Sequence, residues 1–353
     1  MKTIQITIDE KAMLHNLHEI KKHAPASKIL AMVKANAYGH GLLTIGNILL
    51  NEVDGFGIAR MDEALLLRKN FPHKKIVLLS GFFNEEELTF VQQHHIDVVI
   101  HRHDQIQLLK ENPSQSVMNL WIKVDTGMNR LGFSPEEALS IYETLNYLPK
   151  VHIECMMTHF ACANEDNVKV TQHQFSQLRQ LKQQFPNIAW SSAKSGTIFS
   201  VPEFNDDWIR PGIALYGINP FDQGLASDLN LKPVMTLRAK IISIHAVKKN
   251  ETVGYGGTWT APQDTTIAIV TVGYADGYSR HMRQGTPVLI NGRTYPLIGR
   301  VCMEMLIVEL GHSKDVQLGD DAILWGDKLP IEQIAKQADT TPYELLCNVK
   351  LGR

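Results

Sequence analysis

The chain has 353 residues, which is long for one domain and comfortable for two. Hydrophobic residues make up 44% of it and charged residues 20%, as in globular proteins with a substantial core. The formal net charge of −2 gives no reason to expect a nucleic acid or an anionic membrane as a partner.

No stretch approaches the ~20 apolar residues of a membrane span, and the first ten residues lack an apolar signal core. The cysteines show neither CxxC nor metal-ligand spacing, and we expect reduced thiols in a cytoplasmic protein. The pairs His94-His95 and His101/His103 are not spaced to share a helix face, and HExxH does not occur. We therefore expect no metal.

The first 220 or so residues alternate short apolar runs with amphipathic stretches. Residues 2–8 are predicted to form a strand, and Asp9 to cap a helix whose apolar face carries Met13, Leu17 and Ile20. Further apolar runs are Ile29–Val33, Gly55–Ala59, Ile76–Leu79, Asp97–Ile100, Leu120–Val124, Ile153–Met157, Ile188–Ser192 and Trp208–Ile209. Helical periodicity lies between most of them, as in Met61–Lys69, Glu85–Gln93, Pro135–Leu145 and Val168–Gln184.

Eight such alternations indicate an α/β fold, a (β/α)8 barrel over residues 7–225, because parallel strands need crossover helices. A doubly wound open sheet is the structural alternative, but no GxGxxG motif opens a helix after an early strand.

The pattern changes to mostly antiparallel β after the barrel. The predicted strands are Met235–Val247, Thr265–Val272, Pro287–Ile290, Thr294–Leu297, Met305–Leu310 and Ala322–Leu324. Asn291-Gly292 between two of them is a two-residue hairpin signal. The second domain is therefore predicted to span residues 226–353, completed by residues 1–6.

A lysine ends the first predicted barrel strand, at Lys34, and a glycine-flanked turn follows it at once. A desolvated lysine is nucleophilic near neutral pH. Residues 33–41 read VKANAYGHG, which resembles the cofactor-lysine motif of alanine racemases. This resemblance implies a pyridoxal-phosphate enzyme that pairs a barrel with a β domain, and it spans nearly the whole chain.

Polar side chains recur at the carboxyl ends of several predicted strands, where barrels gather their catalytic groups. Lys123, His159, Ser195 and Arg210 follow four of these strands, and each matches a motif of the family in the same order. Ser195 and the backbone N–H groups at Gly212-Ile213 are suited to a phosphate, which barrels commonly hold after the last two strands. The resemblance implies that Tyr38, His159 and Tyr343 also contact the cofactor.

The resemblance assigns Arg210 to the pyridine nitrogen of the cofactor. A permanent cation there disfavours a protonated nitrogen, which suits a proton that leaves and returns quickly. Racemisation needs a base on each face of the planar intermediate, and the resemblance implies Lys34 and Tyr255. Because a free phenol has a pKa of ~10, Tyr255 needs neighbours such as His159 and Arg210.

Lys34 lies in the predicted barrel and Tyr255 in the β domain. The resemblance resolves this with a homodimer in which the tyrosine comes from the partner chain. It also implies that Arg130 and the Met303 backbone hold the substrate carboxylate and that Tyr274 narrows the entrance. Because Lys123 and Arg130 would repel each other, the family's remedy is a carbamate (N6-carboxylysine) on Lys123.

Three positions depart from the family pattern, at Lys194, Asn250 and Glu304, where asparagine, glycine and aspartate are usual. The resemblance implies interconversion of L- and D-alanine for cell-wall synthesis. Racemisation of another small amino acid such as serine stays open, as does a fold-related decarboxylase, although decarboxylases use an acidic partner in place of Arg210. A non-catalytic pyridoxal-phosphate carrier would lack the β domain.

Overall fold

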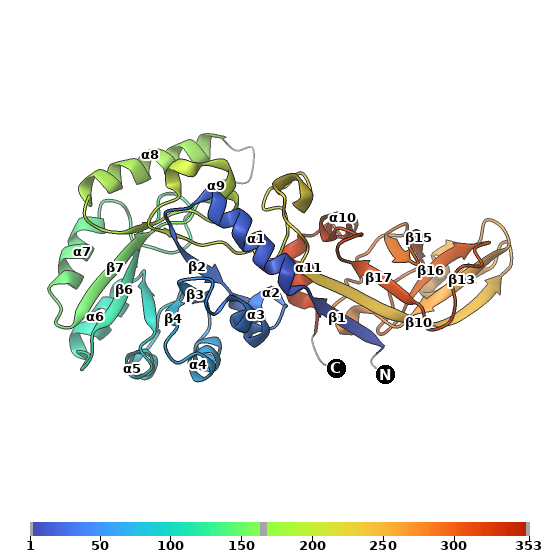
Figure 1. The fold of residues 1–353 in the computed structure, drawn as a ribbon, viewed down its shortest axis with the longest axis horizontal. Coiled ribbons are helices and arrows are strands. Elements are labelled where there is room, and N and C mark those ends of the chain that lie inside the picture. The colour runs from blue at the N-terminus through green and yellow to red at the C-terminus, as the bar shows by residue number, and fades with distance from the viewer. Residues whose placement is uncertain (1–2, 163–167, 351–353) are drawn as a thin grey trace.

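The computed structural model describes residues 3–162 and 168–350, and it divides into a helix-wrapped barrel and a β-rich region (Figure 1). The barrel sheet is parallel throughout, with the strand order β8-β7-β6-β5-β4-β3-β2-β9. Its strands are β2 (Lys28–Met32), β3 (Gly55–Ile58), β4 (Lys75–Leu78), β5 (Asp97–Ile100), β6 (Met118–Lys123), β7 (Val151–Met157), β8 (Trp190–Ser191) and β9 (Trp208–Ile209).

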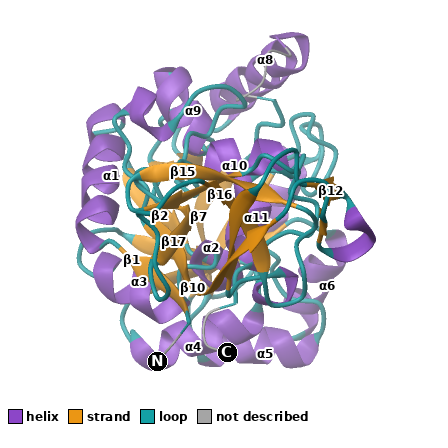
Figure 2. Cartoon of the chain, turned by 90° about the vertical axis from the view of Figure 1, so that its right-hand side faces the viewer, coloured by secondary structure: helices purple, strands orange, loops and turns teal. Residues whose placement is uncertain are grey.

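The two ends of this sheet meet just beyond β8 and β9. The Arg210 N–H donates to the Ala193 carbonyl at 3.0 Å, and Lys194 forms a parallel bridge with Arg210. The ring is therefore closed, which confirms the predicted (β/α)8 barrel. Figure 2 shows helices around the outside of the strands.

Eight helices of the described chain accompany the barrel strands. They are α1 (Glu10–His23), α3 (Leu42–Leu49), α4 (Met61–Asn70), α5 (Glu85–Gln93), α6 (His103–Glu111), α7 (Ala138–Asn146), α8 (Val168–Gln184) and α9 (Ser195–Ser200). The N-cap prediction is confirmed, because the Asp9 carboxylate accepts from the Ala12 N–H at 3.0 Å. The bounds of α5 and α8 match the predicted stretches, whereas α7 begins three residues later than expected.

The inside of the barrel has a small core of its own. Its buried residues are Leu30, Val77, Val99, Trp121, Cys155, Met157 and Trp208. Side chains alternate across a strand, so the residue two positions after an inward-facing one also points inward. Lys123 and Arg210 stand in this relation to Trp121 and Trp208, which directs both side chains into the barrel at its carboxyl end.

The second sheet is antiparallel, in the order β1-β10-β13-β16-β15-β14-β17, and β17 also pairs with β10. Its strands are β1 (Ile4–Ile8), β10 (Met235–Val247), β13 (Thr265–Val270), β14 (Pro287–Ile290), β15 (Arg293–Ile298), β16 (Leu306–Gly311) and β17 (Asp321–Trp325). β1 pairs antiparallel with β10, so the N-terminal strand belongs to this sheet. Asn291 and Gly292, with φ of 47° and 82°, form the predicted hairpin turn between β14 and β15.

Short elements connect the rest. They are β11 (Thr252–Val253), β12 (Trp259–Thr260), α2 (Lys34–Tyr38), α10 (Ile331–Gln337), α11 (Pro342–Asn348) and the single turns η1 (Pro202–Phe204), η2 (Ala226–Leu229), η3 (Tyr255–Gly257) and η4 (Tyr274–Asp276). Helix α11 lies between the two regions (Figure 1) and packs on the turn after β2, where a Cβ at Gly39 would come within 2.0 Å of the Leu346 carbonyl oxygen.

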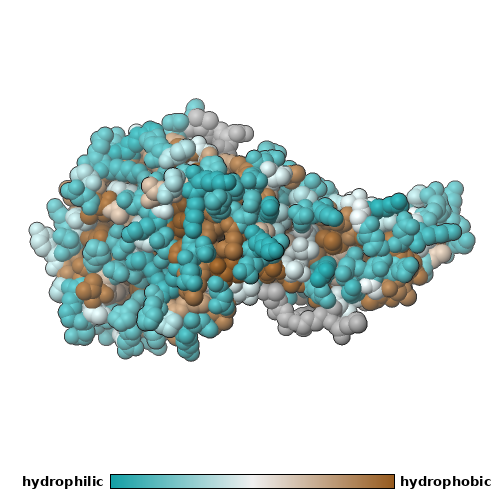
Figure 3. All heavy atoms as spheres, in the orientation of Figure 1, coloured by the Kyte–Doolittle hydropathy of each residue, from teal (hydrophilic) through white to brown (hydrophobic). Residues whose placement is uncertain are grey.

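The surface is mostly hydrophilic, with hydrophobic atoms gathered toward the middle of the face in Figure 3. Across residues 3–162 and 168–350, none of the helices is both long and apolar enough to cross a membrane.

Candidate active site

A cavity of about 380 Å³ opens at the carboxyl ends of the barrel strands. Its lining includes ten of the predicted site residues, Lys34, Tyr38, Lys123, Arg130, His159, Ser195, Arg210, Gly212, Ile213 and, from α11, Tyr343. Side chains of five cationic residues line it, and no carboxylate does among the described lining residues. Such a cavity is suited to a ligand with more than one negative group.

Lys34 follows β2 and begins a left-handed turn. Ala35, Asn36, Ala37 and Tyr38 have φ values of 55°, 53°, 54° and 51°, a conformation that costs roughly 1–2 kcal/mol per residue outside glycine. The sequence favoured an ordinary turn at this point. Burial, followed by the positive charge of Arg130, lowers the pKa of Lys34, which increases the fraction of neutral amine at neutral pH.

Arg210 is 4% exposed, and both terminal nitrogens of its guanidinium donate to neutral acceptors. One terminal nitrogen donates to the Ser191 carbonyl and hydroxyl, both at 2.6 Å. The other donates to the carbonyls of Thr158 at 2.6 Å and Ser192 at 3.3 Å. Burial lowers the pKa of Arg210 to about 10, so the group stays protonated at neutral pH. The side chain is thus a fixed cation within the cavity wall.

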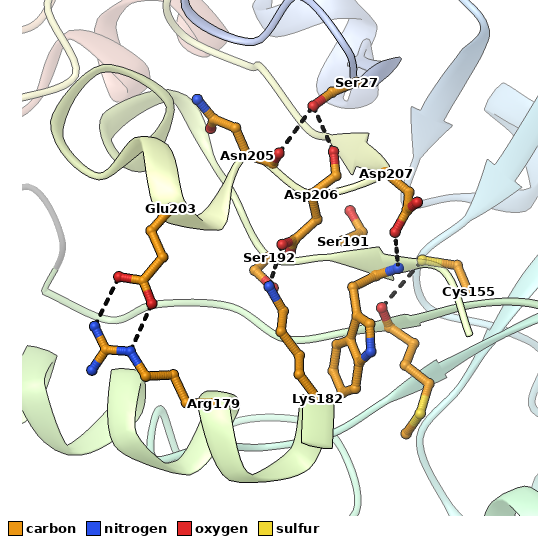
Figure 4. A network of polar contacts seen from close by, with 12 residues as sticks. Ser27, Cys155, Arg179, Lys182, Ser191, Ser192, Glu203, Asn205, Asp206 and Asp207 are labelled. Atoms are coloured by element: carbon orange, nitrogen blue, oxygen red, sulfur yellow. Dashed lines mark hydrogen bonds and ion pairs between the residues drawn. The ribbon is translucent and has the colours of Figure 1, made fainter. Parts of the chain in front are cut away.

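A polar network beside β8 and β9 holds the segment that precedes Arg210 (Figure 4). Asp206 pairs with Lys182 of α8, and the Asp207 carboxylate accepts from the Trp190 N–H of β8 at 2.9 Å. Glu203 and Arg179 add an ion pair at 2.6 Å nearer the surface. The register of the last two strands is therefore held by side chains as well as by the sheet.

The surroundings of Lys123 and His159 shift both groups toward their neutral forms. Burial and then the charges of Arg210 and Arg130 lower the pKa of Lys123 to about 7. Burial and then Arg210 lower the pKa of His159 well below its usual value. The cavity therefore holds an uncharged imidazole and an amine that is partly neutral at physiological pH.

Arg130 is exposed at the cavity edge and is carried by a loop that folds around Asp125. The Asp125 carboxylate accepts from the N–H groups of Gly127, Met128, Asn129 and Arg130 at 2.8–3.1 Å. Burial alone would raise the pKa of Asp125, but these donors lower it. Asp125, which shapes this loop, was not among the site residues predicted from the sequence.

The opposite part of the lining is rich in hydroxyl and backbone N–H groups. The Ser195 hydroxyl accepts from the N–H of Gly212 at 2.9 Å and of Ala214 at 3.3 Å. A Cβ at Gly212 would lie 2.6 Å from the Tyr38 hydroxyl, so only glycine allows the phenol to reach this wall. Tyr343 lies next to Tyr38, with ring centroids 6.0 Å apart.

Three predicted site residues lie elsewhere, at one edge of the β region. Tyr255, Met303 and Tyr274 are 70%, 56% and 41% exposed and do not line the cavity. The loops of Tyr274 and Met303 are joined, because the Ala275 N–H donates to the Met303 carbonyl at 2.9 Å. One chain therefore carries two separate groups of candidate residues.

The departures from the family pattern fall in different places. Lys194 lines the cavity beside Ser195, whereas Glu304 is exposed next to Met303. Asn250 adopts a φ of 70°, a conformation that asparagine tolerates better than most residues.

Comparisons with known proteins agree with this geometry. Residues 8–220 match the family model "Alanine racemase, N-terminal domain", and residues 234–352 match "Alanine racemase, C-terminal domain". The chain is 44% identical to an alanine racemase of Coxiella burnetii over 97% of this chain and 95% of that protein. It is 43% identical to one of Shewanella sediminis over 96% of this chain and 94% of that protein.

Solved structures agree as well. The biosynthetic alanine racemase of Pseudomonas aeruginosa superimposes with a TM-score of 0.94 at 38% identity, covering 99% of this chain and 98% of that one. The alanine racemase of Acinetobacter baumannii gives 0.93 at 36% identity, with coverage of 99% and 98%. The chain belongs to the alanine racemase family.

Proposed function

We propose that the protein interconverts L- and D-alanine with pyridoxal phosphate and two bases, Lys34 and Tyr255. The observation that carries this proposal is the cavity at the carboxyl ends of the barrel strands, where a lysine with a lowered pKa faces a buried, permanently charged arginine. Serine is the nearest alternative substrate. A decarboxylase is disfavoured because Arg210 takes the place that those enzymes give to an acid.

The residues present fit the cofactor. Lys34, Lys123, Arg130, Lys194 and Arg210 surround the space, and anions such as a phosphate and an amino-acid carboxylate are the ligands that this lining selects. We assign the phosphate to Ser195, Tyr38, Tyr343 and the backbone at Gly212 and Ile213. When bound, pyridoxal phosphate draws electrons from the α-carbon of the attached amino acid and makes its α-proton acidic.

Side chains of the protein itself then hold the cofactor, move the proton and orient the substrate. Lys34 holds the cofactor and moves the proton on one face, for which a lowered pKa is suited. Arg210, held by Ser191 and Thr158, supplies a positive charge that limits how far the pyridine nitrogen is protonated. Neutral His159 is suited to relay a proton, and Arg130 orients the substrate carboxylate.

The second base must approach from outside the cavity of its own chain. We propose a homodimer in which Tyr255 of the partner subunit faces Lys34, with Met303 and Tyr274 of the partner subunit closing the entrance. The support is the exposure of these side chains together with Leu131 and Tyr343, which are 40% and 42% exposed in the cavity lining. Large exposed apolar side chains on two faces favour association.

We further propose that Lys123 reacts with carbon dioxide to form a carbamate, releasing one proton to solvent. A neutral amine is the reactive form, and a pKa of about 7 supplies it. The negative product would pair with Arg130 and Arg210 and remove the repulsion among three neighbouring cations. The folded protein in ¹³C-bicarbonate should show one carbamate carbon resonance that is absent from Lys123→Arg; no such resonance, together with a freely acylated Lys123 amine, would contradict this.

We place the enzyme in the cytoplasm, where it would supply D-alanine for peptidoglycan. We retain residues 7–225 as the barrel domain and residues 226–353 with 1–6 as the β domain.

The test uses the purified protein in deuterium oxide. L-alanine should exchange its α-hydrogen and yield D-alanine, faster than L-serine does, and borohydride reduction should leave the cofactor on Lys34. Loss of carbon dioxide from the substrate, or no exchange with L-alanine, would overturn the proposal.

A further inference from the structure

The left-handed turn after Lys34 is an improbable conformation that needs support from its surroundings. Four consecutive non-glycine residues, 35–38, have positive φ, and none of them is chosen by intrinsic preference except Asn36. Such segments persist only where neighbouring structure holds them, and they concentrate at functional sites. The direction of this turn decides where both Lys34 and Tyr38 point.

One side chain from another element supports the backbone of this turn. Glu63 of α4 is 8% exposed, and its Oε1 accepts from the Asn36 N–H at 2.9 Å. Its second oxygen faces the Ala59 N–H at 3.5 Å, at the carboxyl end of β3. Among the described residues outside segment 33–42, no other side chain is recorded as a hydrogen-bond partner of the turn's backbone.

The hydrogen bond between Glu63 and Asn36 lies close enough to Lys34 in the chain to affect its position. Asn36 lies two residues beyond Lys34, and its own side chain accepts from the Leu42 N–H at 2.8 Å, which ties the turn to the start of α3. Because Glu63 is bound at both ends, to the turn and to the end of β3, it fixes the position of Lys34 relative to the barrel wall.

We propose that Glu63 is a positioning residue for Lys34: its buried carboxylate pins the left-handed turn at the Asn36 N–H and so holds the lysine in register with the cavity. This rests on the proposed function for its catalytic consequence. The carboxylate has a second effect, since its charge raises the pKa of Lys34. It acts against burial and the charges of Arg130 and Arg210, while Cys347 acts in the same direction as Glu63.

Two substitutions separate the hydrogen bond from the charge. Glu63→Gln retains an oxygen for the Asn36 N–H and removes the charge, at the expense only of the long contact with the Ala59 N–H, whereas Glu63→Ala removes everything. Glu87→Gln is the matched control, because Glu87 on the next helix also accepts from a loop N–H, that of Phe83 at 2.8 Å, but does not line the cavity.

The first measurement is the release of pyridoxal phosphate from the holoenzyme, followed by absorbance. Glu63→Ala should release the cofactor roughly tenfold faster than wild type, because the Asn36 N–H loses its side-chain acceptor and the turn relaxes. Glu63→Gln and Glu87→Gln should stay within about twofold of wild type. Wild-type release rates in Glu63→Ala would overturn the proposal.

The second measurement is the primary deuterium isotope effect with α-deuterated L- and D-alanine. Displacing one base makes its own proton transfer more rate-limiting, so Glu63→Ala should increase the isotope effect for one enantiomer only, the one whose α-hydrogen faces Lys34. An equal change for both enantiomers, or none, would overturn the proposal. Wild-type protein that fails to racemise would instead overturn the proposed function, while the cofactor-release measurement would still decide the role of Glu63.

Discussion

The barrel and the β region hold their candidate residues in opposite ways. In the barrel, Arg210 and Lys123 are 4% and 7% exposed, and the Arg210 guanidinium is held by three carbonyls and one hydroxyl. In the β region, Tyr255 and Met303 are 70% and 56% exposed and lie in the loops between β11 and β12 and between β15 and β16. A single large exposed side chain is common in folded proteins and needs no explanation. Several exposed side chains that together match the active site of one family do require one. The barrel builds its part of the site alone, whereas the β region presents its part outward.

The largest expected effect tests the candidate residues that the β region exposes. Tyr255→Phe should lower the racemisation rate by roughly 10²- to 10⁴-fold, because one face of the substrate loses its base, although Tyr255 does not touch its own chain's cavity. Tyr147→Phe is the control, since Tyr147 is 85% exposed at the end of α7. Wild-type rates in Tyr255→Phe would show that the β region does not take part.

The next substitution tests the candidate residues that are buried in the barrel. Arg210→Lys should lower the free energy of unfolding by about 2–4 kcal/mol, because an ammonium cannot satisfy the four acceptors that the guanidinium holds. Urea denaturation measures this. Arg179→Lys should change the free energy of unfolding by less than about 1 kcal/mol, since its ion pair with Glu203 is exposed. Equal effects of the two substitutions would contradict a structural role for Arg210.

A smaller effect is expected at the loop that carries Arg130. Asp125→Asn should raise the KM for alanine roughly tenfold and leave kcat less affected, because the four N–H groups lose a charged acceptor. The pKa of Asp125 is lowered in the folded state, so its stabilising effect is present above the unfolded value of about 3.9 and is lost as pH falls through the folded value. The variant should therefore show less acid destabilisation than wild type; an unchanged acid limb would contradict this.

The smallest effect is expected at Lys194. Lys194→Asn restores the usual family residue and removes one of five cations from the lining, so the cofactor should leave about two- to fivefold faster at low salt, with less difference at high salt. Slower release in the variant would show that Lys194 opposes the bound anion.

Periodicity was sufficient for the regular elements. The strand β10 and the helices α5 and α8 coincide with their predicted bounds because the spacing of their apolar residues matches the period of the element. The helices α3 and α9 lie outside the helical stretches that were named, since six to eight residues give too few turns for a clear period. The helix α6 was not named either, although it has nine residues, as many as α5.

Residues of the site were predicted only where they belong to a recognised sequence motif. The turn 35–38 contains no glycine, so nothing in the local sequence predicted its left-handed conformation. Glu63 is one acidic residue among several in the first turns of helices, and only the folded structure shows that it accepts from Asn36. Tyr343 reaches the cavity because α11 packs on the turn after β2, a long-range contact that local sequence does not encode.

The most direct test of the shared site is subunit complementation. Lys34→Ala and Tyr255→Ala are each expected to be inactive. After equimolar subunits are dissociated and reassociated, half of the dimers would be hybrids with one intact site each, giving about a quarter of wild-type racemase activity. Hybrid dimers that form, as shown by native mass spectrometry, and yet remain inactive would contradict a site built from two chains.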